Sequence, residues 1–110
     1  MPELFLRAVL LAHIIAGEAG VCGMDGKLAV AHVYVNRGGA VVGWYGSAQP
    51  NSLDLYIALT WDEMPDPTHG ARYLFGTTDR DQPAVQHLLK GRQQTTTFRC
   101  AGGLTLEAWR

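Results

Sequence analysis

The hydrophobic positions near the start of the chain follow a helical spacing. Apolar side chains recur three and four residues apart from about Glu3 to Ala16, on nearly every side of the predicted helix. A helix that is apolar almost all round is expected to be deeply buried. A signal peptide is the alternative interpretation, but its basic start is missing, Arg7 and His13 interrupt the apolar stretch, and no small-residue cleavage site precedes Gly17. The stretch is also too short to span a membrane, so we expect a soluble protein with no export signal of its own.

A run of glycines separates this helix from a second one. Glycine occurs at every third position from Gly17 to Gly26, and so many flexible residues disfavour a helix, so the segment is expected to be a loop. Asp25 is a suitable N-cap for a second helix over about residues 26–37, because its carboxylate can accept a hydrogen bond from the first turn. His32 lies between two apolar residues of that helix, which favours a core histidine over a catalytic base.

A long connection follows the second helix. Residues 38–51 contain five glycines or prolines and two neighbouring aromatic residues, Trp44 and Tyr45. Loops of this length are often functional, and an aromatic ring is suited to stacking on a sugar. We therefore expect this loop to form one wall of a ligand cleft.

The remaining residues predict two short helices and a small sheet. β-branched and aromatic runs separated by Ala-Gly-Gly are typical of a hairpin. The expected elements are a helix of about ten residues capped by Asn51 or Ser52 and ended by the turn at Pro65 and Pro67, a strand over residues 71–75, a helix from Pro83 to Gly91, and strands over residues 95–100 and 104–109. Helices followed by a small antiparallel sheet indicate an α+β fold, and no linker or repeat divides residues 1–110 into more than one domain.

Size and charge narrow the function. The 110 residues, 47% hydrophobic and 17% charged, suffice for one folded domain with its own core. The net charge of -1 does not provide the positive field that non-specific nucleic-acid binding requires, so nucleic acid is not an expected partner.

The cysteines and the missing ligand motifs argue against a metal. Cys22 and Cys100 are too few for a four-thiolate zinc site, and neither CxxC nor HExxH occurs. We expect no metal and no cofactor. The two cysteines are compatible with one long disulfide loop, but their separation in the sequence does not decide the matter.

Glu18 is the strongest candidate for catalysis. It follows an apolar helix at the edge of the glycine run, and apolar surroundings favour the protonated carboxyl that a general acid needs. The structural alternative is that Glu18 caps the glycine-rich loop. Cys22 is a rival nucleophile, because a thiol close to a helix N-terminus can be activated.

Three ordered segments of the sequence resemble the SleB-type cell wall hydrolase family, which is typified by a spore cortex-lytic enzyme. Residues 14–20 (IIAGEAG) are similar to the family's GEA(R)G motif. Residues 26–37, which begin GKLAVA and end VNR, are similar to its GQVAVAxVxxNR helix, and residues 66–75 (DPTHGARYLF) to its DPTxGAxYF segment. The resemblance departs from the family at His69, where a glycine is usual.

The resemblance implies a lysozyme-like or lytic-transglycosylase-like domain that cuts the β-1,4 bond between N-acetylmuramic acid and N-acetylglucosamine in peptidoglycan. The family's catalytic glutamate corresponds to Glu18. Its Asn-Arg pair corresponds to Asn36 and Arg37, and its aromatic residue to Tyr73; these are candidates for lining the cleft, together with Trp44 or Tyr45 from the long loop. The partner would be a peptidoglycan glycan strand, reached from a bacterial wall-lytic system or after release of a phage endolysin.

The number of suitable carboxylates favours transglycosylation over hydrolysis. A standard hydrolase needs a second carboxylate at a set distance. Only Asp62, Glu63 and Asp66 lie near enough to the middle of the domain to be considered, and Asp66 before a proline is more typical of a turn. Two other functions remain open on the sequence alone: a thiol amidase or peptidase that uses Cys22, and a non-catalytic glycan-binding or virion structural module.

Overall fold

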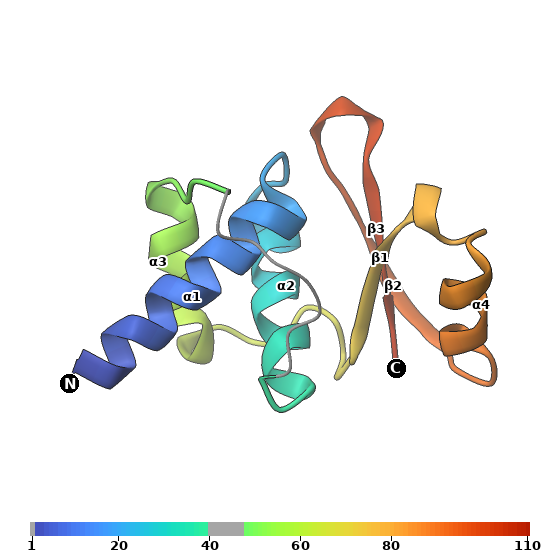
Figure 1. Cartoon of the computed structure of the whole chain (residues 1–110), viewed down its shortest axis with the longest axis horizontal. Coiled ribbons are helices and arrows are strands. Elements are labelled where there is room, and N and C mark those ends of the chain that lie inside the picture. The colour runs from blue at the N-terminus through green and yellow to red at the C-terminus, as the bar shows by residue number, and fades with distance from the viewer. Residues whose placement is uncertain (1, 40–47) are drawn as a thin grey trace.

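A computed structural model describes residues 2–39 and 48–110 of the chain. Three helices form one side of the molecule, a small antiparallel sheet stands beside them, and a fourth helix covers the far face of the sheet (Figure 1). The predicted α+β fold with a small antiparallel sheet is confirmed, with α4 between the first and second strands of the chain. The described part of the chain contains no helix that is both long and apolar enough to cross a membrane.

Helices α1 (Pro2–Ala19), α2 (Met24–Asn36) and α3 (Ser52–Thr60) enclose the main core. Small side chains allow α2 to lie in the middle of the molecule, and Ala29 and Ala31 are fully buried there. Ile15 of α1 and Ile57 of α3 are also fully buried. The three helices therefore share one tightly packed interior.

The expected deep burial of the first helix is wrong for much of its surface. Ala12 and Ile15 face the core, whereas Phe5 and Leu6 are 64% and 65% exposed. The apolar side chains of α1 surround the helix, but only the side facing α2 and α3 finds partners, so an apolar pattern alone overstated its burial.

The expected loop after the first helix is also shorter than the glycine spacing predicted. The helix continues to Ala19 and thus includes Gly17 and Glu18. Complete burial of Ala19 offsets the cost of about 1 kcal/mol for one glycine in a helix. The second helix begins at Met24 with Gly23 at its N-cap, so Asp25 lies in the first turn and is not the cap.

The C-terminal elements agree more closely with expectation. Asn51 caps α3 in a reciprocal capping box with Asp54, and Pro83 begins α4 (Pro83–Leu89). Gly91, with φ +76°, follows that helix as expected. Three-residue 3-10 turns occur at 61–63 and 77–79.

The sheet consists of β1 (Tyr73–Gly76), β2 (Gln94–Arg99) and β3 (Thr105–Trp109), in the order β1-β3-β2 and antiparallel throughout. The predicted hairpin is formed by β2 and β3, which are joined through a tight turn at 101–103. Alternation along β3 directs Leu106 and Ala108 into the helical core, so Glu107 and Trp109 lie on the other face, toward α4.

Candidate active site

Glu18 lies in the last turn of α1 and is half-buried. Ile14 and Ile15, one turn earlier, are almost completely buried, and Ala19 beside it is fully buried. Gly17 and Gly20 on either side are exposed. Glu18 therefore stands where the apolar helix α1 ends and the glycine-containing turn begins.

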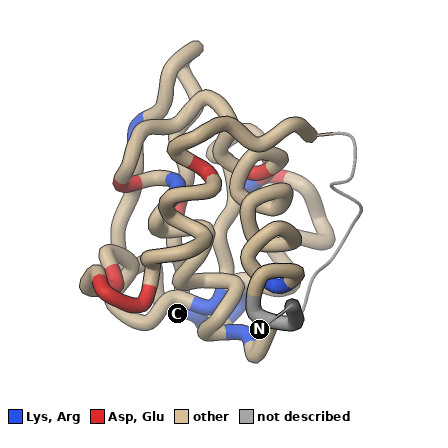
Figure 2. Tube along the Cα trace, turned by 90° about the vertical axis from the view of Figure 1, so that its left-hand side faces the viewer, with Lys and Arg blue, Asp and Glu red and all other residues tan. Residues whose placement is uncertain are grey.

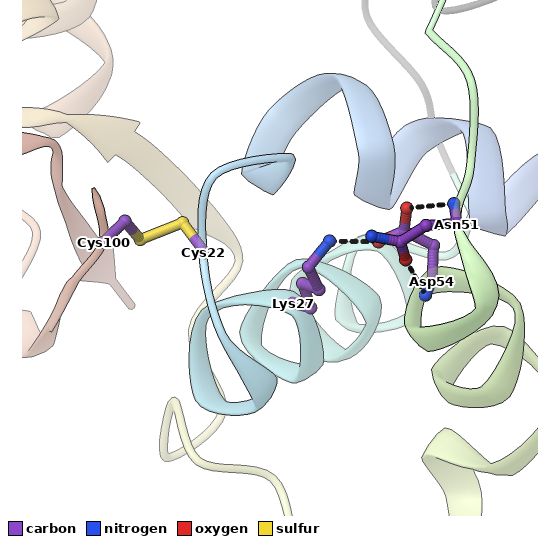
Figure 3. A network of polar contacts seen from close by, with 5 residues as sticks. All are labelled: Cys22, Lys27, Asn51, Asp54 and Cys100. Carbon is purple, nitrogen blue, oxygen red and sulfur yellow. Dashed lines mark hydrogen bonds and ion pairs between the residues drawn. A yellow bond between two sulfur atoms is a disulfide. The ribbon is translucent and has the colours of Figure 1, made fainter. Parts of the chain in front are cut away.

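A disulfide fixes the turn that follows Glu18. Cys22 and Cys100 are bonded to each other, which joins the α1–α2 turn to the β2–β3 hairpin (Figure 3). The backbone N–H of Ala101 also donates to the carbonyl of Val21 at 3.0 Å. A side chain at Gly26 would bring a Cβ within 2.8 Å of the Cys22 Cβ, so a glycine is required where α2 passes the disulfide.

The disulfide argues against one of the two alternative functions, the thiol amidase or peptidase that would use Cys22. A cysteine in a disulfide has no thiolate and is not a nucleophile. Neither described cysteine is free, so the thiol amidase or peptidase does not fit this structure.

The second and third motifs of the resemblance are joined by hydrogen bonds. The Asn36 side-chain nitrogen, at the end of α2, donates to Asp66 Oδ2 at 3.0 Å and to the carbonyl of Ala71 at 2.9 Å. These two bonds use both hydrogens of the Asn36 amide. Asn36 thus holds the turn before β1, instead of offering its NH₂ group to a ligand.

Asp66 organises that turn. Its Oδ1 accepts from the backbone N–H and the hydroxyl of Thr68, and its Oδ2 accepts from the N–H of Gly70. Burial alone would raise the pKa of this carboxyl. The hydrogen bonds, led by those from the Thr68 side chain and the Asn36 amide, outweigh burial and hold the pKa of Asp66 below its ordinary value. The turn assignment made from the sequence is therefore confirmed.

His69 adopts a backbone conformation that favours glycine. Its φ is +56°, in the left-handed region, and Gly70 follows with φ +82°. The departure from the family's usual glycine therefore falls on a residue whose backbone keeps the conformation that glycine adopts most easily.

Tyr73 follows the turn and is half-buried, with two arginines above its ring. The guanidinium carbon of Arg37 lies 5.4 Å from the ring centre and that of Arg92 lies 4.4 Å from it. Arg37 ends α2, whereas Arg92 follows α4. The sequence indicated Arg37 and Tyr73 through the resemblance, but nothing in it indicated Arg92.

The sequence also provided no indication of a buried ion pair. Lys27 of α2 and Asp54 of α3 are each 1% exposed and bonded to each other. Asp54 belongs to the α3 capping box and accepts from the N–H of Asn51 at 2.8 Å (Figure 3). His32 is buried nearby in the core, with its Nε2 3.1 Å from the carbonyl of Met64, as expected for a satisfied core histidine.

The candidate residues do not gather at one point. Glu18 lies in the last turn of α1, before the turn into α2, whereas Asn36 ends α2, which is about 18 Å long at about 1.5 Å per residue (Figure 1). Tyr73 is at the Asn36 end. Trp44 and Tyr45 lie outside the described residues. The structure thus links Asn36, Arg37 and Tyr73 and separates them from Glu18.

A groove of about 880 Å³ lies between α1, the end of α2 and α3. Arg7 and Leu11 line it from α1, and Tyr34 and Asp62 line it from the opposite side. Glu18 is on the same stripe of α1 as Arg7, since eleven residues make three helical turns. A polymer that left the groove along α1 would therefore run toward Glu18.

Comparisons with models of protein families, with curated proteins and with solved structures find no match to this chain.

Proposed function

We propose that this protein is a peptidoglycan-cleaving glycosidase in which Glu18 is the general acid and base. The observation that carries the proposal is the link between distant motif residues. Asn36 of the second motif is bonded to Asp66 and Ala71 of the third. Residues 30 and 35 positions apart thus meet in one turn, so the second and third motif segments form one local unit of this chain.

The position of Glu18 suits an acid catalyst. Its helix supplies apolar neighbours on the inner side, and the glycines around it leave room for a sugar chain to approach. The disulfide and the Gly26 contact hold the adjoining turn in place, which limits the motion of the carboxyl relative to α2.

Three of the other acids serve contacts within the fold. Asp54 is paired with Lys27, and Asp66 is engaged in its turn. Glu107 is buried on the α4 side of the sheet with Arg80 3.6 Å away. These three carboxylates serve other contacts, so a two-carboxylate hydrolysis would need another acid, such as the exposed Asp62 or Glu63.

In the proposed reaction, Glu18 first gives its proton to the oxygen of the β-1,4 bond. That bond breaks as positive charge develops at C1 of the muramic residue. The Glu18 carboxylate then takes the proton of the muramic 6-hydroxyl while the oxygen of that hydroxyl bonds to C1. The products are a free 4-hydroxyl on N-acetylglucosamine and a 1,6-anhydro-muramic end, and Glu18 is protonated again.

The products of digestion test this proposal. Purified peptidoglycan is incubated with the protein in labelled water, and the soluble fragments are analysed by mass spectrometry. We expect 1,6-anhydro ends, each lighter by one water than a reducing end, with no label at C1. Reducing ends that carry the label would instead indicate lysozyme-type hydrolysis, and new amino termini would indicate cleavage of peptides.

A non-catalytic glycan-binding or virion structural module is the second candidate. The separation of Glu18 from Tyr73 and Arg37 along α2 favours it, because extended binding needs no convergence of side chains. Binding to the wall without any soluble product would support this candidate and contradict the enzyme.

A further inference from the structure

Tyr73 and Trp109 lie side by side on the α4 side of the sheet. They are direct partners in the antiparallel register of β1 and β3, so their side chains project from the same face. Arg37 and Arg92 lie above Tyr73, and Arg80 lies 5.8 Å from the centre of the Trp109 ring. Two adjacent aromatic rings thus carry three guanidinium groups that come from different parts of the chain.

Two of these arginines are not neutralised. Arg80 is paired with Glu107 at 3.6 Å. Arg37 and Arg92 have no ion-pair partner among the residues that the structure describes, and residues 40–47 contain no Asp or Glu. Arg92 is oriented by a hydrogen bond from its Nε to the carbonyl of Leu88 at 2.8 Å, which leaves its outer nitrogens available.

Other positive residues lie in the same part of the chain, alongside acidic ones such as Asp81. Lys and Arg segments gather at the end of the molecule where the C-terminus lies (Figure 2), although the whole chain has a net charge of -1. Guanidinium groups bind carboxylates well because their paired N–H donors match the two oxygens. This part of the surface is therefore suited to an anionic group.

A pocket beside Trp109 extends the site. It has a volume of about 490 Å³ and is lined by α4 and the segment before it, with Arg80, Asp81, His87 and Lys90 among the polar side chains. A single small anion would fill a small part of that volume. The space beside the Trp109 ring suits a short chain with apolar and charged groups.

We propose that Arg37 and Arg92 bind carboxylates of a short acidic peptide that extends across Tyr73 and Trp109. The identity of the peptide rests on the proposed function: the stem peptide attached to muramic acid carries carboxylates, whereas N-acetylated sugars are neutral. Arg37 follows the last residue of α2, about 20 Å along the helix axis from Met24. An extended stem of five residues spans about 17 Å, a length of the same order as α2.

The test is a binding measurement that does not depend on catalysis. The full-length Glu18→Gln variant is titrated by calorimetry with a synthetic pentapeptide of stem sequence, and with the same peptide whose carboxylates are amidated. We expect the free-acid peptide to bind and the amidated peptide to bind at least about tenfold more weakly. Binding of the free-acid peptide is also expected to weaken as salt is added.

Arginine variants locate the site. Arg37→Gln with Arg92→Gln is expected to raise Kd at least about tenfold, and the exposed Arg92→Gln change alone should raise it several-fold. Arg99→Gln is the matched control, because Arg99 is an exposed arginine of β2 with no aromatic partner among the residues that the structure describes; it should leave Kd within about twofold. Melting temperatures show whether each variant is folded.

Several results would overturn the inference. They are the absence of peptide binding at millimolar concentration, equal binding of the amidated peptide, an equal effect of Arg99→Gln, or displacement of the peptide by glycerol phosphate at a lower concentration than by acetate. Glycan cleavage without peptide binding would reject this site and leave the proposed function intact. Peptide binding without glycan cleavage would retain the carboxylate site and reject the enzyme.

Discussion

Lys27 and Asp54 form an ion pair that is almost entirely withdrawn from water, at the point where α2 meets α3. Asp54 keeps its second oxygen for the N–H of Asn51. The pair thus couples the packing of two helices to the cap of one of them. A charge left alone in such a place costs far more than the pair itself contributes.

The first prediction concerns this pair. Lys27→Met leaves the Asp54 carboxylate buried without its cation, and we expect it to lower the free energy of unfolding by about 3–5 kcal/mol. Adding Asp54→Asn removes the charge and keeps an oxygen for the cap, so the double variant should be more stable than Lys27→Met by at least about 1 kcal/mol. Urea unfolding of the four proteins in this cycle measures the coupling. Simple addition of the two single effects would contradict the account.

The second prediction concerns the disulfide between Cys22 and Cys100. The bond closes a loop with a sequence separation of 78, and chain entropy alone gives about 4 kcal/mol for a loop of that size. Replacement of both cysteines by serine should lower the free energy of unfolding by an amount of this order. A reductant should have the same effect on the original protein and none on the variant.

The same variant tests whether Cys22 has a role in catalysis. At a temperature where the double serine variant is folded, it should release wall fragments at a rate near that of the original protein. A folded variant with no activity would show that Cys22 contributes more than its bond to Cys100.

The third prediction concerns pH. Because hydrogen bonds hold the pKa of Asp66 below the ordinary 3.8, its carboxylate stabilises the folded state at neutral pH. This contribution should be complete well above pH 3.8 and should be lost as the pH falls toward the lowered folded pKa. Asp66→Asn removes this part of the pH dependence, and loss of its hydrogen bonds should cost about 1–3 kcal/mol at pH 7.

Chemical unfolding of both proteins between pH 7 and pH 2.5 measures the difference. The gap in stability between them should narrow below pH 4. Asp62→Asn is the control, because Asp62 is exposed and should change the curve little. A gap that stays constant through the acid range would show that Asp66 acts without its charge.

The fold was predictable where a residue acts through its own backbone or its near neighbours. The Asn51 cap, the helix start at Pro83 and the Gly-Gly hairpin turn are of this kind, and all three are present. The end of α1 was not predictable in this way. Local propensity favoured a loop at Gly17, whereas the burial of Ala19 favoured one more turn of helix, and burial depends on contacts distant in sequence.

The same division holds for the candidate site. A motif indicated Glu18, and the structure gives its position on α1. Contacts between distant positions, such as that of Arg92 with Tyr73 or of Lys27 with Asp54, leave no periodic signal in the sequence. From the sequence, Lys27 is indistinguishable from a solvated lysine, because its buried carboxylate partner, Asp54, comes from another helix.

The most direct test of the central claim is the rate of wall cleavage by Glu18→Gln. Glutamine keeps the size of the side chain but cannot give up a proton as the acid does, so the rate should fall by about 10²–10⁴ while the melting temperature and glycan binding stay close to those of the original protein. Asp25→Asn is the matched control, since Asp25 is an exposed carboxylate in the first turn of α2, just beyond the same α1–α2 turn, and it should retain most of the activity. A folded Glu18→Gln protein that releases fragments at a near-normal rate would contradict the assignment of Glu18 as the general acid.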